Sequence, residues 1–301
     1  MGEVLWDVFG EAEYLGGAPL NFSAVSQRLG SSVALLTAVG TDQRGARVLD
    51  AMDKLGLTTS FVQRVTEQPT GTAIVAIGSD RNTSFTIERP AAFDCVTVDA
   101  ALLARVAQLA PDWLYFGTLA QANPHMEAAL LHLAESLPHT RRFYDVNLRT
   151  GHWTLALVEK LSSVADILKL NHTEAELLYG LTLDNSDYSL EGFCRHWASR
   201  HEISTICVTL GSDGCAIFDG ETLRSFPGFT VNVVDTVGAG DAFAAAFLHG
   251  LGAGWPLEEN AALANALGAL VASRAGATPD WSIEECYELI RSHSSPRKIP
   301  N

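Results

Sequence analysis

A run of small residues that ends in an aspartate is the segment of this sequence with the clearest chemistry. Gly238-Ala239-Gly240-Asp241 follows the strand-like run 231–234 and leads into an alanine-rich apolar run. A tight turn between a strand and a helix leaves the first N–H groups of the helix free, and the helix dipole adds attraction for phosphate. Asp241 would then suit a general base that takes the proton of a substrate hydroxyl as its oxygen attacks the γ-phosphorus of ATP. Taken alone, the same residues are also typical of an ordinary helix entry with an N-terminal acid.

Polar side chains also follow two other apolar runs, where predicted strands end. Asn147 and Arg149 come after the run 142–146, and their amide and guanidinium groups suit contacts with a phosphate or a polar substrate group. Asn171 and Glu174 follow the run 167–170. The alternatives are a surface arginine in the first case and ordinary helix capping in the second.

An α/β fold must position these segments, because apolar β-branched runs alternate along the chain with longer segments of helical period. The predicted strands are Glu3–Trp6, Ser32–Ala38, Thr72–Ile77, Trp113–Phe116, Arg142–Val146, Ile167–Leu170, Thr205–Leu210 and Cys215–Phe218. The predicted helices are Leu20–Leu29, Gly45–Lys54, Ala100–Leu109, Met126–Leu137, Thr173–Tyr179, Leu190–Arg200, Asp241–Leu251 and Leu257–Ser273. In such a doubly wound, mostly parallel sheet the carboxyl ends of the strands share one edge, where ligands bind.

Two stretches break the alternation of strand and helix. They are Val8–Gly17 and roughly Gln68–Phe93, in which Thr72–Ile77 and Ser84–Glu88 flank the turn 78–82. Turn residues between alternating strands predict a β-hairpin. Extra antiparallel strands beside a parallel sheet indicate a small flap over its carboxyl edge, with an ordinary edge hairpin as the alternative.

Composition and charge argue against several classes of function. The chain has 301 residues, 47% of them hydrophobic, which is enough for a substantial core. Its 20 Lys and Arg against 35 Asp and Glu leave a formal charge of −15, which disfavours nucleic acid and anionic membranes as partners. No apolar run approaches the roughly 20 residues that span a bilayer, and no export signal is evident. Five scattered cysteines predict free thiols and a cytoplasmic location.

Other phosphate-binding schemes do not fit the sequence. A Walker A loop needs Gly-Lys-Ser or Gly-Lys-Thr, and no lysine of the chain stands in that context; the lysines are Lys54, Lys160, Lys169 and Lys298. The sequence also lacks a Gly-x-Gly-x-x-Gly fingerprint after an early strand, so nicotinamide oxidoreduction is disfavoured.

The segment 235–241, Asp-Thr-Val-Gly-Ala-Gly-Asp, resembles the signature of the ribokinase-like (PfkB) carbohydrate kinases. The amino-terminal segments Gly16–Asn21, 28–30 and 39–45 resemble the first signature of that family, and similarity in order covers essentially the whole chain. The resemblance implies a three-layer α/β/α ribokinase-like fold with a small β lid. Residues 1–7, 18–67 and 94–301 would form the core, and residues 8–17 and 68–93 the lid.

The resemblance also implies roles for individual residues. Sugar hydroxyls would be held by Asp7, Gly16, Gly17, Asn21 and Arg149. For Asp7 the alternative is a strand-end acid, and for Asn21 it is a helix N-terminal residue. MgATP would contact Asn147, Asn171, Glu174, Thr209, Gly211, Gly214 and Asn265, with Glu174 organising Mg²⁺ through water. A hairpin corner is the alternative for Gly211 and Gly214, and a solvent-facing side chain for Asn265. Asp235 and Gly276 would lie near a monovalent cation such as K⁺.

The local segments 2–9, 15–19, 89–94 and 116–120 resemble fructokinases, so phosphorylation of D-fructose to fructose 6-phosphate is the first expectation. The alternatives are 2-keto-3-deoxygluconate, a nucleoside-type substrate, or a regulator that binds sugar and nucleotide without catalysis. A homodimer through the lid is also expected. Family members commonly have several residues before the equivalent of Gly2, so we expect either a shortened first central strand or a start upstream.

Overall fold

The computed structural model describes residues 1–77, 83–183 and 188–294. Its main sheet has six strands in the order β12-β11-β10-β9-β8-β7. The inner strands β7 (Trp113–Gly117), β8 (Arg141–Asp145), β9 (Ile167–Asn171) and β10 (Thr205–Thr209) pair in parallel, and β11 (Cys215–Phe218) and β12 (Leu223–Phe226) add an antiparallel edge. The carboxyl ends of four parallel strands therefore share one edge.

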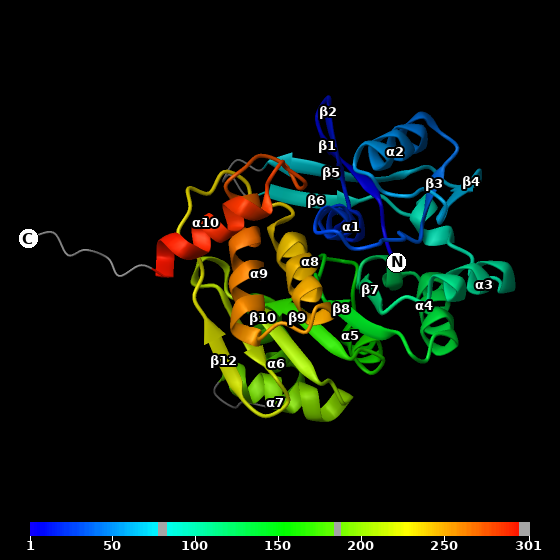
Figure 1. Ribbon diagram of the computed structural model, residues 1–301. Coiled ribbons are helices and arrows are strands. Elements are labelled where there is room, and N and C mark those ends of the chain that lie inside the picture. The colour runs from blue at the N-terminus through cyan, green and yellow to red at the C-terminus, as the bar shows by residue number, and fades with distance from the viewer. Residues whose placement is uncertain (78–82, 184–187, 295–301) are drawn as a thin grey trace, which may run out of the picture.

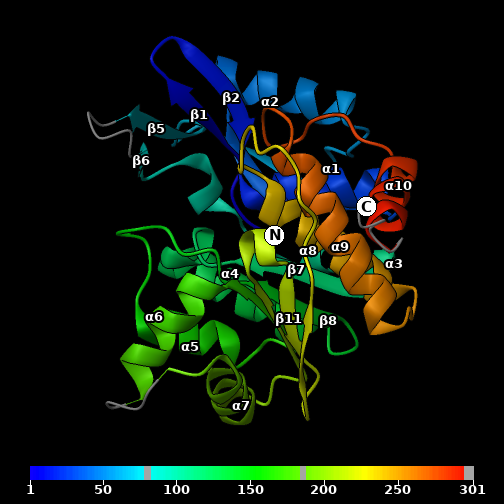
Figure 2. The same ribbon diagram turned by 90° about the vertical axis from the view of Figure 1, so that its left-hand side faces the viewer.

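Helices cover both faces of this sheet (Figure 2). One face packs against α4 (Pro124–Ser136), α5 (Leu155–Ser162), α6 (His172–Thr182) and α7 (Leu190–His201). The other packs against α8 (Ala239–Gly252) and α9 (Leu257–Ala272), which lie side by side, with α1 (Ala18–Arg28) against α8 and α10 (Ile283–Ser294) against α9 (Figure 1).

Strand periodicity explains the two layers. Tyr115, Phe143 and Ile167 belong to the hydrophobic cluster of α8 and α9, whereas their chain neighbours Phe116, Tyr144 and Leu168 belong to the cluster of α4–α7. Successive side chains of a strand point to opposite faces, so a strand buried on both sides needs an unbroken apolar run. The predicted three-layer α/β/α architecture is confirmed.

A second sheet stands apart from the first. It has the order β2-β1-β5-β6, built from β1 (Leu5–Phe9), β2 (Ala12–Gly16), β5 (Gly71–Ile77) and β6 (Thr83–Ile87). The predicted hairpin is confirmed by the antiparallel pairing of β5 with β6, and its turn at 78–82 lies outside the described residues. β1 runs parallel to β5 and antiparallel to β2, so Asp7 stands in the sheet that contains the predicted lid strands.

The third sheet corrects one predicted strand. β3 (Thr37–Gly40) pairs in parallel with β4 (Val62–Val65), whereas the strand was expected over 32–38. Within residues 32–36 the pairing is a single bridge from Ala34 to Thr58, and regular pairing with β4 begins at Thr37. A cavity of about 1010 Å³ lies beside this region, lined by residues 31–36 and 109–115 among others. The first strand was expected at Glu3–Trp6 in the central sheet, but β1 spans Leu5–Phe9 and pairs with β2 and β5 in the second sheet, so that expectation is wrong.

Two remaining helices flank the second and third sheets, α2 (Gln43–Lys54) and α3 (Ala100–Leu109). The sequence patterns missed β4, β12, α5 and α10. β12 exposes two of its four side chains, so it lacks the pattern that indicates a buried strand. α10 does carry helical apolar spacing, at Ile283, Cys286 and Ile290, so the sequence held a signal for this helix. Among the described residues, no helix is long and apolar enough to cross a membrane.

Candidate active site

The first turn of α8 carries the predicted anion site. Gly238 precedes the helix with φ 79°, a left-handed conformation that glycine adopts without strain. A Cβ on Gly238 would lie 2.2 Å from the carbonyl oxygen of Ala277, so this turn also requires glycine for close packing. The Ala239 N–H donates to the Thr236 carbonyl at 3.3 Å. The N–H groups of Val237 and Ala239, expected to face the anion, are thus bonded within the protein, and helix geometry leaves those of Gly240 and Asp241 directed at it.

Asp241 is buried in this turn, with 8% of its surface exposed. Asn21 on α1 donates from Nδ2 to Oδ2 of Asp241 at 2.8 Å, across 220 positions of sequence. The pKa of Asp241 is raised to about 6, chiefly by burial and next by the charge of Asp145, while Asn21, Lys169 and Arg149 act to lower it. A carboxyl group with a pKa near 6 is ionised at neutral pH and accepts a proton readily, as a general base must.

A second carboxylate faces the same region from β1. Gly16 lies against Asp7, because a Cβ on Gly16 would stand 2.6 Å from Oδ2 of Asp7. Burial raises the pKa of Asp7 to about 6, while the positive charge of Arg149 lowers it. Gly17 has φ 110°, and its carbonyl accepts the N–H groups of Leu20 and Asn21 at 3.0 Å. The start of α1 is thereby fixed directly beside β1.

Asn21 connects the start of α1, beside β1, with the first turn of α8. Its side chain is buried, and its Oδ1 atom is buried without a hydrogen-bond partner while Nδ2 bonds Asp241. A buried carbonyl oxygen without a partner is costly, so this atom is suited to accept a hydroxyl proton from a ligand. The expectation of an ordinary helix N-terminal residue does not account for this contact with Asp241.

Glu174 connects β8 and β9 at the carboxyl edge. Its Oε2 accepts the Asn171 N–H at 2.9 Å, and its Oε1 accepts the Leu148 N–H at 2.7 Å. Asn171 in turn accepts the Glu174 N–H, which completes a capping box at the start of α6. The capping alternative therefore holds. Each carboxylate oxygen still has a lone pair, so binding of a water molecule of hydrated Mg²⁺ is compatible with this arrangement.

Asn147 and Arg149 lie in the loop after β8. Asn147 has φ 41°, unusual for a residue with a side chain, and is half-buried. Arg149 is exposed, yet its positive charge lowers the pKa of both Asp7 and Asp241. The structure therefore brings Arg149 close to the two carboxylates that the sequence assigned to substrate and base.

Four of the residues predicted to bind the nucleotide lie at the end of β10 or later in the chain. Thr209 ends β10, and Gly211 follows with φ 62°. A Cβ on Gly214 would come 2.2 Å from the Phe226 carbonyl, so Gly214 is required by packing between two chain segments. Asn265 on α9 is buried and donates to the carbonyls of Phe226 and Pro227 at 3.4 and 3.1 Å. The alternative of a solvent-facing Asn265 is wrong; this side chain holds the loop after β12.

Asp235 and Gly276 are brought together by the two loops that meet beneath α8. Asp235 Oδ1 accepts the Val237 N–H at 3.0 Å, and its Oδ2 accepts the Gly276 N–H at 3.1 Å. A Cβ on Gly238 would touch Ala277 of the same loop. Both oxygens of Asp235 therefore stabilise the loops, and backbone carbonyls nearby would have to supply most ligands of a monovalent cation.

Sequence reasoning missed a buried ion pair at the centre of this edge. Lys169 Nζ donates to both carboxylate oxygens of Asp145 at 3.0 Å, and the Tyr115 hydroxyl donates to Oδ2 at 3.1 Å. The side chains of Lys169 and Asp145 are 8% and 1% exposed. Lysine within an apolar strand was the available signal, because lysine is almost never buried unless it is paired.

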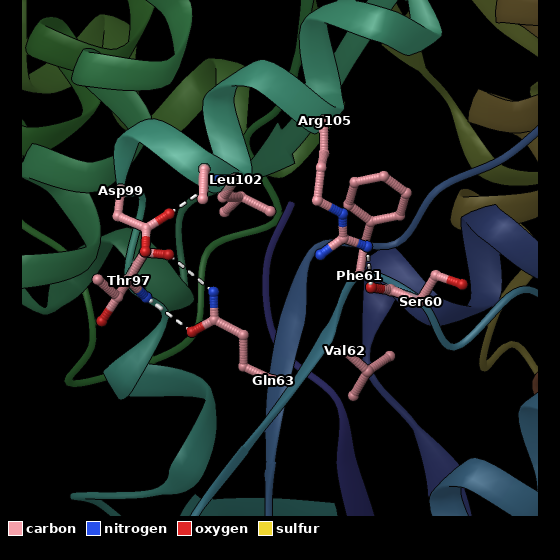
Figure 3. Close-up of a pocket in the computed structure, with 9 residues that line it drawn as sticks. Ser60, Phe61, Val62, Gln63, Thr97, Asp99, Leu102 and Arg105 are labelled. Atoms are coloured by element: carbon pink, nitrogen blue, oxygen red, sulfur yellow. Dashed lines mark hydrogen bonds between the residues drawn. The ribbon is translucent and has the colours of Figure 1, made fainter.

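Two cavities lie outside this site. The smaller one, about 300 Å³, is formed between β4 and α3, where Gln63 and Thr97 exchange two hydrogen bonds and Arg105 donates to the Ser60 carbonyl (Figure 3). Neither this pocket nor the cavity of about 1010 Å³ is lined by a predicted site residue. Of the predicted site residues, Asn21 bonds Asp241 directly and Arg149 acts on it through its charge.

Comparison with known proteins agrees with this geometry. The family model described as pfkB family carbohydrate kinase matches residues 3–284. The chain belongs to this family. Members of the pfkB family are phosphotransferases that act on sugar hydroxyl groups, so the predicted kinase class and the enzyme assignment are confirmed.

Relatives of this pfkB kinase span nearly its whole length. Fructokinase-1 of Oryza sativa subsp. japonica is 28% identical over 92% of this chain and 88% of its own. The 5-dehydro-2-deoxygluconokinase of Clostridium tetani is 26% identical over 93% of this chain and 84% of its own. The crystal structure of fructokinase with bound ATP from Xylella fastidiosa superposes with a TM-score of 0.85 at 22% identity, covering 98% of both chains. The predicted ribokinase-like fold is thereby confirmed.

Proposed function

We propose that this pfkB kinase transfers the γ-phosphoryl group of ATP to a primary hydroxyl of D-fructose, giving fructose 6-phosphate. The observation that carries the proposal is the buried Asp241 carboxylate at the N-terminus of α8, bonded to Asn21. It combines a base with an anion site in one helical turn. The similarity to the rice fructokinase supports fructose as the sugar.

In the proposed mechanism, sugar hydroxyls bind Asp7 and the free Oδ1 atom of Asn21, close to Asp241. Asp241 takes the proton of the primary hydroxyl as that O–H bond breaks. The hydroxyl oxygen forms its bond to the γ-phosphorus, and the bond from that phosphorus to the bridging oxygen breaks, leaving its electron pair on ADP. The N–H groups of Gly240 and Asp241 stabilise the transferring group, and Arg149 offsets its charge.

The residues present fit hydrated Mg²⁺ bound mainly through the phosphates of ATP. Glu174, with Asn171 and Asn147 nearby, would hold its waters, and the ion would neutralise negative charge on the phosphates. The nucleotide would extend toward Thr209, Gly211 and Asn265. Asp235 and Gly276 would stabilise a monovalent cation such as K⁺ through the loops that they join.

We extend the proposal to residues 8–17 and 68–93 as a lid whose closure excludes water. The strands β2 and β6 form the two edges of the second sheet, and Tyr14 on β2 is 59% exposed. Exposed strand edges pair readily with a second chain, so a homodimer through this sheet is part of the proposal. A cytoplasmic location is supported by the five free cysteines.

A sugar acid is the second candidate substrate. The relative from Clostridium tetani is a 5-dehydro-2-deoxygluconokinase, and the exposed guanidinium of Arg149 near Asp7 suits a carboxylate on the substrate. A sugar acid would then bind more tightly through Arg149 than an uncharged ketose does.

ADP release with MgATP tests the proposal directly. We would compare fructose, ribose, 2-keto-3-deoxygluconate, 5-dehydro-2-deoxygluconate and nucleosides, in wild type and in Asp241→Asn. Asp280→Asn, an exposed aspartate paired with Arg28, is the matched control. We expect turnover on fructose that falls by at least about two orders of magnitude in Asp241→Asn, the usual scale of general-base catalysis, and is unchanged in Asp280→Asn.

Other results would redirect the assignment. Preference for a sugar acid would select the second candidate. Ligand-dependent thermal stabilisation without ADP formation on any substrate would indicate a binding protein and refute the kinase mechanism. Near-normal turnover in Asp241→Asn would refute the role of Asp241.

A further inference from the structure

A buried ion pair lies directly beneath the proposed anion site. Lys169 on β9 stands opposite Asp145 on β8 in the parallel register, and its ammonium donates to both oxygens of that carboxylate. Taking two charges out of water costs several kcal/mol per ion, and a well-packed apolar pair is often as stable. Ile167 on the same face of β9 and Phe143 on the same face of β8 are fully buried and apolar. An apolar pair would therefore suit the packing at this position.

The position of the ammonium relates the pair to the base. A Cβ on Gly240 would stand 3.3 Å from Nζ of Lys169, so the ammonium packs against the residue that precedes Asp241. Tyr115 on β7 holds Asp145 through its hydroxyl, so the pair is fixed from three adjacent strands. A side chain fixed in this way has little freedom to move away when the charge on Asp241 changes during the reaction.

Charges of both signs surround Asp241 when the pair is intact. Asn21 on α1 is neutral; Asp145, Lys169, Arg149, Glu3 and Tyr115 interact with Asp241, and Glu174 interacts with Lys169. Asp145 raises the pKa of Asp241, whereas Lys169 and Arg149 lower it. Without Lys169, two carboxylates would face each other in a buried site with only the exposed Arg149 as counter-charge.

We propose that Lys169, held by Asp145 and Tyr115, is a positioning residue that supplies the counter-charge for the Asp241 carboxylate. The inference rests on the proposed function of Asp241 as the base. When Asp241 accepts the sugar proton, negative charge moves from its carboxylate to the phosphoryl group at the same helical turn. A fixed cation beneath that turn stabilises the charge before and after the transfer, without reorganisation.

The pH profile of kcat separates this role from a merely structural one. We would measure it in Lys169→Met, Asp145→Asn, the double variant and Lys169→Arg, with Lys160→Met as the matched control at an exposed lysine paired with Glu127. Lys169→Met is expected to move the acid limb upward by about one pH unit, and Asp145→Asn to move it downward. The double variant removes one charge of each sign, so its limb returns toward the wild-type position. In Lys169→Arg and Lys160→Met the acid limb of the kcat profile is expected at the same pH as in wild type.

A second measurement reads the ionisation of Asp241 without turnover. Asp241→Asn is introduced into the wild-type and Lys169→Met backgrounds, and the difference in unfolding free energy is followed from pH 5 to pH 8. The inference expects the pH-dependent range of this difference to extend to higher pH in the Lys169→Met background. If wild type releases no ADP with any sugar, the proposed function fails, and this difference still tests the counter-charge.

A uniformly lower kcat in Lys169→Met with an unmoved acid limb would overturn the inference and leave the pair a structural element. An acid limb at the wild-type pH in the double variant supports the inference only if the two single variants shift that limb in opposite directions. If Lys169→Met does not fold, the Asp145→Asn shift and the double variant decide the question.

Discussion

Replacing Asp241 by asparagine is expected to stabilise the ligand-free protein at neutral pH while it abolishes turnover. The structure gives the reason: burial raises the pKa of Asp241 from 3.8 to about 6. Between these values the folded state binds more protons than the unfolded state, so the ionised carboxylate lowers the free energy of unfolding progressively as pH rises. Asparagine removes this penalty, and its side-chain oxygen retains an acceptor for Nδ2 of Asn21.

The expected magnitude follows from the two pKa values. At pH 5 the penalty amounts to about 1–2 kcal/mol, and above pH 7 it reaches about 3 kcal/mol. The stability gain of Asp241→Asn over wild type should therefore roughly double between pH 5 and pH 7.5. Below the unfolded pKa the gain should disappear, since both states are then protonated.

Urea unfolding without ligand, at several pH values between 5 and 8, measures this difference. Asp280→Asn serves as the control, because that exposed carboxylate should change stability little at any pH. A gain that does not vary with pH would refute the assignment of the effect to ionisation. A variant less stable than wild type at pH 7.5 would refute the claim that the carboxylate is held at a cost to folding.

Three further predictions follow from the site. Turnover of wild type should fall as pH drops through about 6, because the base is then protonated. A pH–rate profile whose acid limb lies near pH 4 would contradict the raised pKa of Asp241. Gly238→Ala should lower both activity and melting temperature. The new Cβ would meet Ala277, and a φ of 79° costs a residue with a side chain about 1–2 kcal/mol. Unchanged kinetics would show that the turn adapts. Glu174→Gln should destabilise the fold by about 1–3 kcal/mol, because an amide NH₂ would face the N–H of Leu148 or Asn171. The same variant should raise the KM for MgATP. A KM equal to that of wild type would show that Glu174 is not part of the nucleotide site.

Local sequence patterns determined the elements that depend on neighbouring residues. The strand β10 and the helices α3, α8 and α9 follow from apolar periodicity and turn residues, and the predicted bounds differ from the observed ones by at most two residues. The turn before Asp241 was also predictable, because glycine at 238 is needed where the backbone takes a left-handed conformation before a helix. Short or half-exposed elements such as β12 were missed, since their side chains carry no buried pattern.

Tertiary structure decided which polar groups share the site. Nothing in the local sequence indicates that Asn21 bonds Asp241 across 220 positions, or that Asn265 holds the loop after β12. Lys169 and Asp145 meet only because β8 and β9 pair in a particular parallel register, which is a property of the sheet. The pKa of Asp241 likewise depends on burial and on charges from three other segments, so the sequence alone identified the base while only the fold set its proton affinity.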